Sequence, residues 1–77
     1  MTPDQCRAAR GWLDWSQPDL ASAAHVSLST VRDFEKGRRV PIANNLAAMK
    51  AALEAKGIAF VDGAALGITF NNINEKH

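Results

Sequence analysis

Disulfide bonds and long apolar runs are both missing from this sequence of 77 residues. Its one cysteine, Cys6, has no second cysteine to pair with, and one cysteine with two histidines cannot form a four-ligand structural zinc site. A single unpaired thiol is typical of a reducing compartment, so we expect a cytoplasmic protein. No apolar run approaches the ~20 residues of a membrane span, and residues 1–4 lack the features of a signal peptide.

Motifs of catalysis are also scarce. No nucleophile stands beside a base in a recognisable motif, and no Gly-rich loop is present that would hold a phosphate. His25 and His77 are isolated, and Cys6 fits the apolar face of a helix. We therefore expect no enzyme, and no need for a cofactor, a metal or a small-molecule ligand.

The length is enough for a single domain over residues 1–77. A core of this size buries only ~60% of the surface that the unfolded chain exposes, so we expect a second copy to add stability. The net charge of +1 says little about partners. The segment from Arg32 to Arg39 says more, because four basic residues stand there against the two acidic residues Asp33 and Glu35.

Capping signals predict the starts of three helices, and the helical spacing of Leu46, Met49 and Leu53 before Gly57 predicts a fourth, whose start has no cap residue at Ile42. Thr2, Ser16 and Ser27 are residue types that accept backbone N–H groups at a helix start, and Thr2 with Gln5 makes a capping box. The first two expected helices run from their caps to about Trp12 and Ala24, with Asp14 and His25 in the turns that follow. The third runs from Ser27 to a C′ residue at Gly37, and the fourth covers residues 43–56 and stops at Gly57.

After Gly57 the apolar pattern changes from a period of 3.6 to a period of 2. Residues 58–61 and 67–70 predict two short strands joined by residues 62–66, and the polar tail 71–77 is expected to fray. A lone two-stranded hairpin is marginally stable in water, so its apolar side chains need a partner surface. The expected fold is mostly α, with four helices and a short C-terminal β-hairpin.

Trp12 and Trp15 would suit the stacking of bases from a single-stranded nucleic acid. Trp15 directly precedes a helix cap and Trp12 ends an amphipathic helix, however. We expect both side chains in or near the core.

Residues 16–37 form the most informative segment. Only His25 and Val26 separate two short helices, and the small side chain of Ala21 would let them approach closely. Two short helices joined by a tight turn form a helix-turn-helix, whose second helix enters the major groove of DNA.

The segment also carries an ordered set of motifs: Trp15-Ser16-Gln17, Asp19-Leu20-Ala21, Val26-Ser27, Ser29-Thr30-Val31, Phe34-Glu35-Lys36-Gly37 and Pro41. With these motifs, residues 5–53 resemble the Cro/C1-type (XRE) helix-turn-helix family of phage repressors and small bacterial regulators. The sequence departs from that family at His25, where glycine is usual, and a left-handed turn there would cost about 1 kcal/mol. The resemblance implies a compact four-helix repressor-like domain.

The resemblance also implies roles in DNA contact. On the second helix of the motif Val31 and Phe34 are expected to face inward, which leaves the remaining side chains for DNA. The base-reading candidates are Leu28, Ser29, Arg32 and Asp33; the phosphate-binding candidates are Gln17, Ser27, Thr30, Lys36, Arg38 and Arg39. Leu28 either packs on a thymine methyl group or is a scattered surface leucine. Arg10 and Glu35 match the positions of a buried ion pair in this family.

Helix 43–56 and the hairpin, together residues 43–70, are expected to form a homodimer. The interface candidates are Leu46, Met49, Leu53, Ile58, Phe60, Ile68 and Phe70. A dimer would place two recognition helices about 34 Å apart, as a palindromic operator in double-stranded DNA requires. We expect a transcriptional regulator, either a repressor or an autoregulatory switch. An antitoxin or a protein-binding modulator on the same fold is the alternative.

Overall fold

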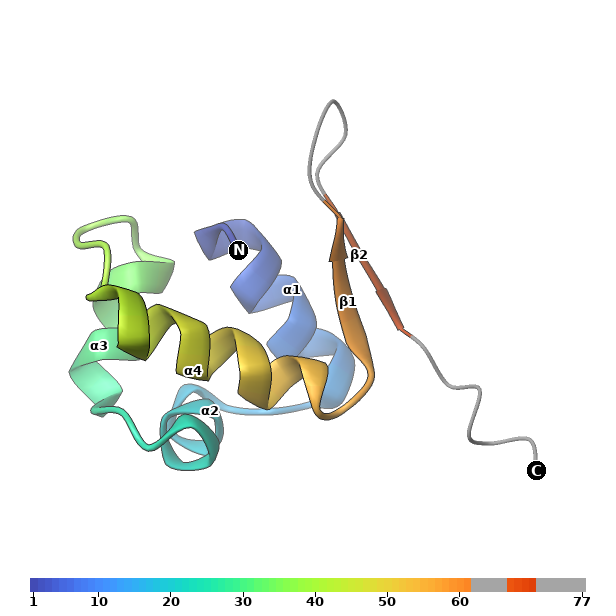
Figure 1. The fold of residues 1–77 in the computed structure, drawn as a ribbon, viewed down its shortest axis with the longest axis horizontal. Helices are drawn as coiled ribbons and strands as arrows, with labels where there is room; N and C mark the ends of the chain where they lie inside the picture. The colour runs from blue at the N-terminus through green and yellow to red at the C-terminus, as the bar shows by residue number, and fades with distance from the viewer. Residues whose placement is uncertain (62–66, 71–77) are drawn as a thin grey trace.

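Four helices precede a two-stranded antiparallel sheet in the computed structural model, which describes residues 1–61 and 67–70 (Figure 1). The elements are α1 (Pro3–Leu13), α2 (Gln17–Ala24), α3 (Leu28–Glu35), α4 (Ala43–Glu54), β1 (Ile58–Val61) and β2 (Gly67–Phe70). This confirms the mostly α class with a short C-terminal hairpin. The predicted connection 62–66 and the tail 71–77 lie outside the described residues. None of the described helices is long and apolar enough to cross a membrane.

The first three helices begin at the predicted caps. The side chains of Thr2, Ser16 and Ser27 each accept the backbone N–H of the residue three positions later, at 3.1, 3.1 and 3.2 Å. At Thr2 and Ser16 the third helical residue returns a bond to the cap, which completes a capping box. Helix α4 has no such cap, because Ile42 stands at its N-cap position.

Residues in the left-handed conformation end the first two helices. Asp14 ends α1 with φ 59° and His25 ends α2 with φ 58°. The next N–H, that of Val26, bonds to the carbonyl of Ala21 at 3.0 Å and closes the tight turn before α3. Helix α4 ends at Glu54 instead of the predicted Lys56, because its last turn tightens toward Gly57.

One apolar core joins all four helices to the first strand. Its members are Cys6, Ala9, Leu20, Ala21, Ala24, Val31, Phe34, Met49, Leu53 and Ile58. The small side chains of Ala21 and Ala24 let α2 approach α3 and α4 closely, since any longer side chain there would hold the helices apart. Trp15 packs against this core, as predicted.

The prediction for Trp12 is wrong, because 63% of this residue is exposed. Cys6, Ala9 and Leu13 form the face of α1 that packs on the core. Trp12 follows Gln5 by seven residues, about two turns, and so continues the side of α1 that faces the hairpin. That position lies outside the face formed by Cys6, Ala9 and Leu13, so the helix does not carry Trp12 into the core.

The hairpin and α3 lie at opposite ends of the molecule, with α1 and α4 between them (Figure 1). In the ladder Ile58 pairs with Phe70 and Val61 pairs with Gly67. The strands pack on α1 and α4, which provide the partner surface that a lone hairpin lacks.

Candidate nucleic-acid interface

One face of α3 is open to solvent. Val31 and Phe34 are buried, as expected from their spacing, while Ser29, Arg32 and Lys36 are exposed. Leu28 and Asp33, predicted on the same outer face, are only partly exposed. Fewer side chains of this face are fully exposed than the sequence pattern predicted, and the exposed ones include no acidic residue.

Three hydroxyl groups meet at the start of α3. The Oγ atom of Ser27 lies 2.8 Å from Oγ1 of Thr30 and 3.1 Å from Oγ of Ser29, and it also caps the helix. The N-terminal end of a helix attracts anions, because its first N–H groups lack helical partners and its dipole is positive there. This end of α3 thus offers both hydroxyl and N–H donors.

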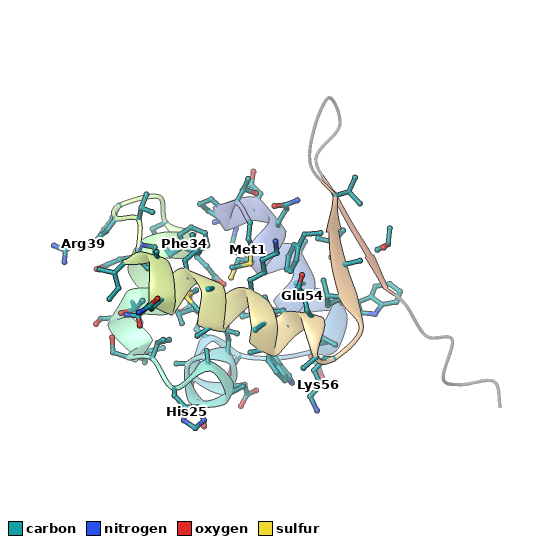
Figure 2. The ribbon with its side chains drawn as sticks, viewed as in Figure 1. Met1, His25, Phe34, Arg39, Glu54 and Lys56 are labelled. Carbon is teal, nitrogen blue, oxygen red and sulfur yellow. The ribbon has the colours of Figure 1, made fainter. Side chains whose placement is uncertain are left out.

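Basic side chains continue past the end of α3. The backbone N–H groups of Arg38 and Arg39 both bond to the carbonyl of Asp33, at 2.9 and 3.4 Å, which holds the loop against the helix. Both arginines are exposed, and Figure 2 shows Arg39 pointing away from the body of the molecule. With Lys36 they place three cations beside the open face of α3.

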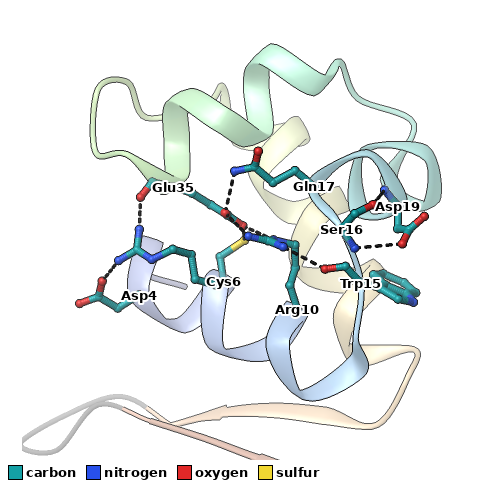
Figure 3. A network of polar contacts seen from close by, with 9 residues as sticks. Asp4, Cys6, Arg10, Trp15, Ser16, Gln17, Asp19 and Glu35 are labelled. Carbon is teal, nitrogen blue, oxygen red and sulfur yellow. Dashed lines mark hydrogen bonds and ion pairs between the residues drawn. The ribbon is translucent and has the colours of Figure 1, made fainter.

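Glu35, at the last position of α3, is the centre of a buried polar network (Figure 3). Its carboxylate accepts Nε and Nη2 of Arg10, each at 2.7 Å, in a bidentate ion pair. Cys6 donates its thiol at 3.0 Å, and Nε2 of Gln17 donates at 3.0 Å. Since Glu35 is only 2% exposed, this network ties α1, α2 and α3 together in the interior.

The charge states follow from these contacts. Burial alone would raise the pKa of Glu35, but the hydrogen bonds from Arg10, Cys6 and Gln17 outweigh it, and the pKa lies below its ordinary value. The hydrogen bond to Glu35 raises the pKa of Arg10. Burial, and then the bond to Glu35, raises the pKa of the Cys6 thiol. The network therefore holds one anion, one cation and one neutral thiol.

Two of the predicted site residues have internal partners in this network. Gln17, a phosphate-binding candidate, uses one N–H for Glu35 and carries a second N–H on the same nitrogen. Arg10 also donates Nη1 to the carbonyl of Trp15 at 2.9 Å, so each of its three guanidinium nitrogens has a partner inside the protein.

Arg7 is part of the same region and was not predicted. It donates to the backbone carbonyl of Glu35 and pairs with Asp4. The spacing of Asp4 and Arg7, three residues apart in a helix, would have indicated the ion pair. Nothing in the sequence indicated the contact with Glu35, because it depends on how α1 and α3 pack.

A hollow beside α3 was also missed. It has a volume of about 210 Å³ and lies between α3, the following loop and the start of α4. Val40 and Ile42, which are 76% and 69% exposed, flank the buried Pro41 at its wall. Its other lining residues are Ser29, Thr30, Asp33, Arg39 and Asn45. The sequence did carry a signal for this hollow, namely the apolar residues 40–42 directly after Arg38 and Arg39.

The predicted dimer residues divide into two groups. Met49, Leu53 and Ile58 are at most 3% exposed inside the chain's own core, so they lie beneath any surface that a partner could contact. Leu46, Phe60 and Ile68 are partly exposed around that core. The side chain of Phe70 lies outside the described part of the structure.

The four helices and the start of the hairpin match a known protein family. The sequence model of a family described as a helix-turn-helix domain matches residues 4–59, from α1 into β1. No curated protein matches the chain. The match covers well over half of the residues and includes the complete α2–turn–α3 unit, without singling out the Cro/C1-type branch. The chain therefore belongs to the helix-turn-helix domain family.

Proposed function

We propose that the chain is a sequence-specific DNA-binding transcriptional regulator of Cro/C1 type that inserts α3 into the major groove. Membership of the helix-turn-helix family indicates a DNA-binding regulator in general. The observation that carries the specific proposal is the distribution of charge on and after α3. Within residues 28–39, all of which the structure describes, four basic side chains are exposed and no acidic side chain is.

The two acidic residues of this segment are less exposed than its basic residues. Glu35 is buried in the ion pair with Arg10, and Asp33 is partly buried. The local balance of four basic against two acidic residues therefore understates the positive charge that DNA would meet. This favours a polyanionic partner.

In this proposal the residues in the first turns of α3 contact the bases. An exposed Arg32 has the fork of donors that guanine O6 and N7 accept, a pairing that discriminates between bases by about 1–3 kcal/mol. Ser29 lies in the same turn, and Leu28 would pack its exposed part on a thymine methyl group. Asp33 would read a cytosine through its N4 amino group.

Phosphate binding falls to the residues around this face. They are Gln17 and Thr30 at the starts of α2 and α3, Ser27 at the cap of α3, and Lys36, Arg38 and Arg39 beyond its end. Contacts of this kind give affinity and salt dependence without sequence information.

A homodimer on a palindromic operator completes the proposal. Leu46, Phe60 and Ile68 are the predicted interface residues that retain exposed surface. The alternative, an antitoxin or protein-binding modulator, has one observation in its favour: the exposed Val40 and Ile42 beside α3. Apolar side chains of that kind suit a protein surface as well as a DNA groove.

The test is selection of binding sites from random double-stranded DNA, followed by titrations of the selected site and a scrambled site over a salt series. We expect an enriched palindrome whose affinity falls with salt by a log–log slope near −0.9 for each phosphate contacted. An unselected pool, or equal binding of both sites at every salt concentration, would refute sequence-specific regulation and favour the protein-binding role.

A further inference from the structure

The amide of Gln5 joins three parts of the backbone. Its Oε1 accepts the N–H of Thr2 at 2.8 Å, as the capping box requires. Its Nε2 donates to the carbonyl of Val61 at 2.9 Å and to the carbonyl of Gly67 at 2.8 Å. Gln5 is only 4% exposed, so its amide lies inside the protein, while the bonds that it makes to the hairpin are partly buried. Both N–H groups of the side chain are therefore used on the hairpin.

The two carbonyls belong to opposite strands. Val61 and Gly67 face each other in the ladder, at the end where the chain leaves β1 and returns through β2. One nitrogen atom thus spans the hairpin across its last described pair. Each strand has four residues, and a sheet of two such strands is marginal without external support. The two bonds from Gln5 Nε2 to the carbonyls of Val61 and Gly67, called the Gln5 clamp below, supply that support from α1.

The same helix also binds α3. Cys6, the next residue, and Arg10, one turn later, bond to the Glu35 carboxylate, and Arg7 bonds to the Glu35 carbonyl. Figure 1 places the hairpin and α3 at opposite ends of the molecule with α1 between them. Neighbouring side chains of α1 therefore connect the hairpin to the end of α3 by a short series of buried and partly buried polar contacts.

We propose that Gln5 is a positioning residue that fixes the hairpin relative to α3. If the proposed dimer forms through the hairpin, this position sets the separation of the two α3 helices and hence the preferred spacing of operator half-sites. The effect on half-site spacing depends on the proposed function, whereas the bonds from Gln5 to the hairpin do not.

Two variants isolate the clamp. Gln5→Glu keeps the length of the side chain and an oxygen for the N–H of Thr2, but its ionised carboxylate meets two carbonyl oxygens with no proton to donate. Gln5→Met removes the donors without adding a charge. Thr2→Ala is the matched control, because it removes the 3.1 Å cap bond from the N–H of Gln5 and leaves the amide clamp intact.

Amide hydrogen exchange in the free protein at pH 7 tests the clamp. We expect exchange in residues 58–61 and 67–70 to be roughly 10–100-fold faster in both Gln5 variants, as for the loss of two buried hydrogen bonds. Exchange in α2 and α3 should stay near the wild-type rate, and Thr2→Ala should leave the hairpin unchanged. Unchanged hairpin exchange in both Gln5 variants would overturn the clamp, and an equal acceleration in every element would reduce Gln5 to a general stability residue.

Binding to palindromes with varied half-site spacing tests the link to α3. We expect the wild type to prefer one spacing by roughly 10-fold or more, because one mismatch in a site typically changes affinity by such a factor. The two Gln5 variants should lose most of that preference. The wild type and both variants should bind a single half-site equally. A preference retained by both variants would overturn the link. If the wild type binds no DNA, the proposed function fails, and hydrogen exchange alone then decides the clamp.

Discussion

Arg10 and Glu35 lie 25 residues apart on different helices, yet their side chains meet in a bidentate ion pair with two donor–acceptor distances of 2.7 Å. The pair joins α1 to the C-terminal end of α3. Glu35 also accepts bonds from Cys6 and Gln17, so this one carboxylate links α3 to both α1 and α2.

Arg10→Ala should destabilise the protein by about 3–5 kcal/mol, because it leaves the buried carboxylate of Glu35 without its cation. Urea denaturation followed by circular dichroism measures the loss. Arg7→Ala is the control, because it removes a surface ion pair with Asp4 and one bond to the Glu35 backbone carbonyl, from a side chain that is 47% exposed, and leaves the Glu35 carboxylate paired with Arg10. We expect that variant to lose about 1 kcal/mol or less. Equal losses in the two variants would contradict a special role for the buried pair.

Acid should weaken the protein through Glu35. Because its pKa is lower in the folded state than in the unfolded chain, where it is about 4.3, its stabilisation is fully present above that pH. The stabilisation is lost as the pH falls through the lower pKa of the folded protein. Glu35→Gln should be less stable at pH 7, and its unfolding free energy should change less than that of the wild type between pH 5 and 2. Parallel curves for the two proteins would show that other carboxylates govern acid unfolding.

Alkali should weaken the protein through Cys6. Its pKa is raised in the folded state, so its contribution is complete below the unfolded thiol pKa of about 8.5 and declines as the pH rises above it. The sequence contains no tyrosine, which leaves this pH range free of phenol titration. Unfolding free energies at pH 7, 8.5 and 10 should fall for the wild type and stay nearly level for Cys6→Ala. A decline of the same size in Cys6→Ala would assign it to another group.

Arg32 and Arg38 should differ in what they contribute to DNA binding. Arg32→Ala is expected to lower affinity for the selected site by about 1–3 kcal/mol and to relax sequence preference at one position. Arg38→Ala is expected to weaken all sequences alike and to reduce the salt slope by about 1. Both arginines are exposed, so neither change should disturb the fold. Identical effects of the two substitutions on preference and slope would contradict this division.

His25→Gly should stabilise the protein by up to about 1 kcal/mol, because His25 has the left-handed φ of 58° that glycine adopts without strain. Thermal unfolding measures the gain. Ala23→Gly is the opposite control: Ala23 is exposed inside α2, and glycine there should destabilise by about 0.5–1 kcal/mol. A lower melting temperature for His25→Gly would mean that the histidine side chain stabilises the turn.

Local structure was predictable from sequence because its causes are local. A cap such as Ser16 bonds to a backbone N–H three residues away, and a turn residue such as His25 acts through its own φ. The starts of α1, α2 and α3, the left-handed positions and the two strands follow from such short-range rules, whereas α4 starts without a cap. The inward positions of Val31 and Phe34 follow from the helical period alone.

Contacts between distant residues were decided by the tertiary structure. Gln5 was predicted as a partner of Thr2 three residues away, but its amide also reaches Gly67, 62 residues away. Met49 and Leu53 carry the apolar pattern of either a core or an interface, and only the packing of α2 against α4 places them inside. Trp12 is exposed because it lies outside the face of α1 that packs on the core. The helix-turn-helix and its basic segment could be predicted without the structure, since caps, turns and composition act over a few residues. The tertiary structure decided which side chains meet at Glu35 and at the hairpin, because those contacts exist only once the helices pack.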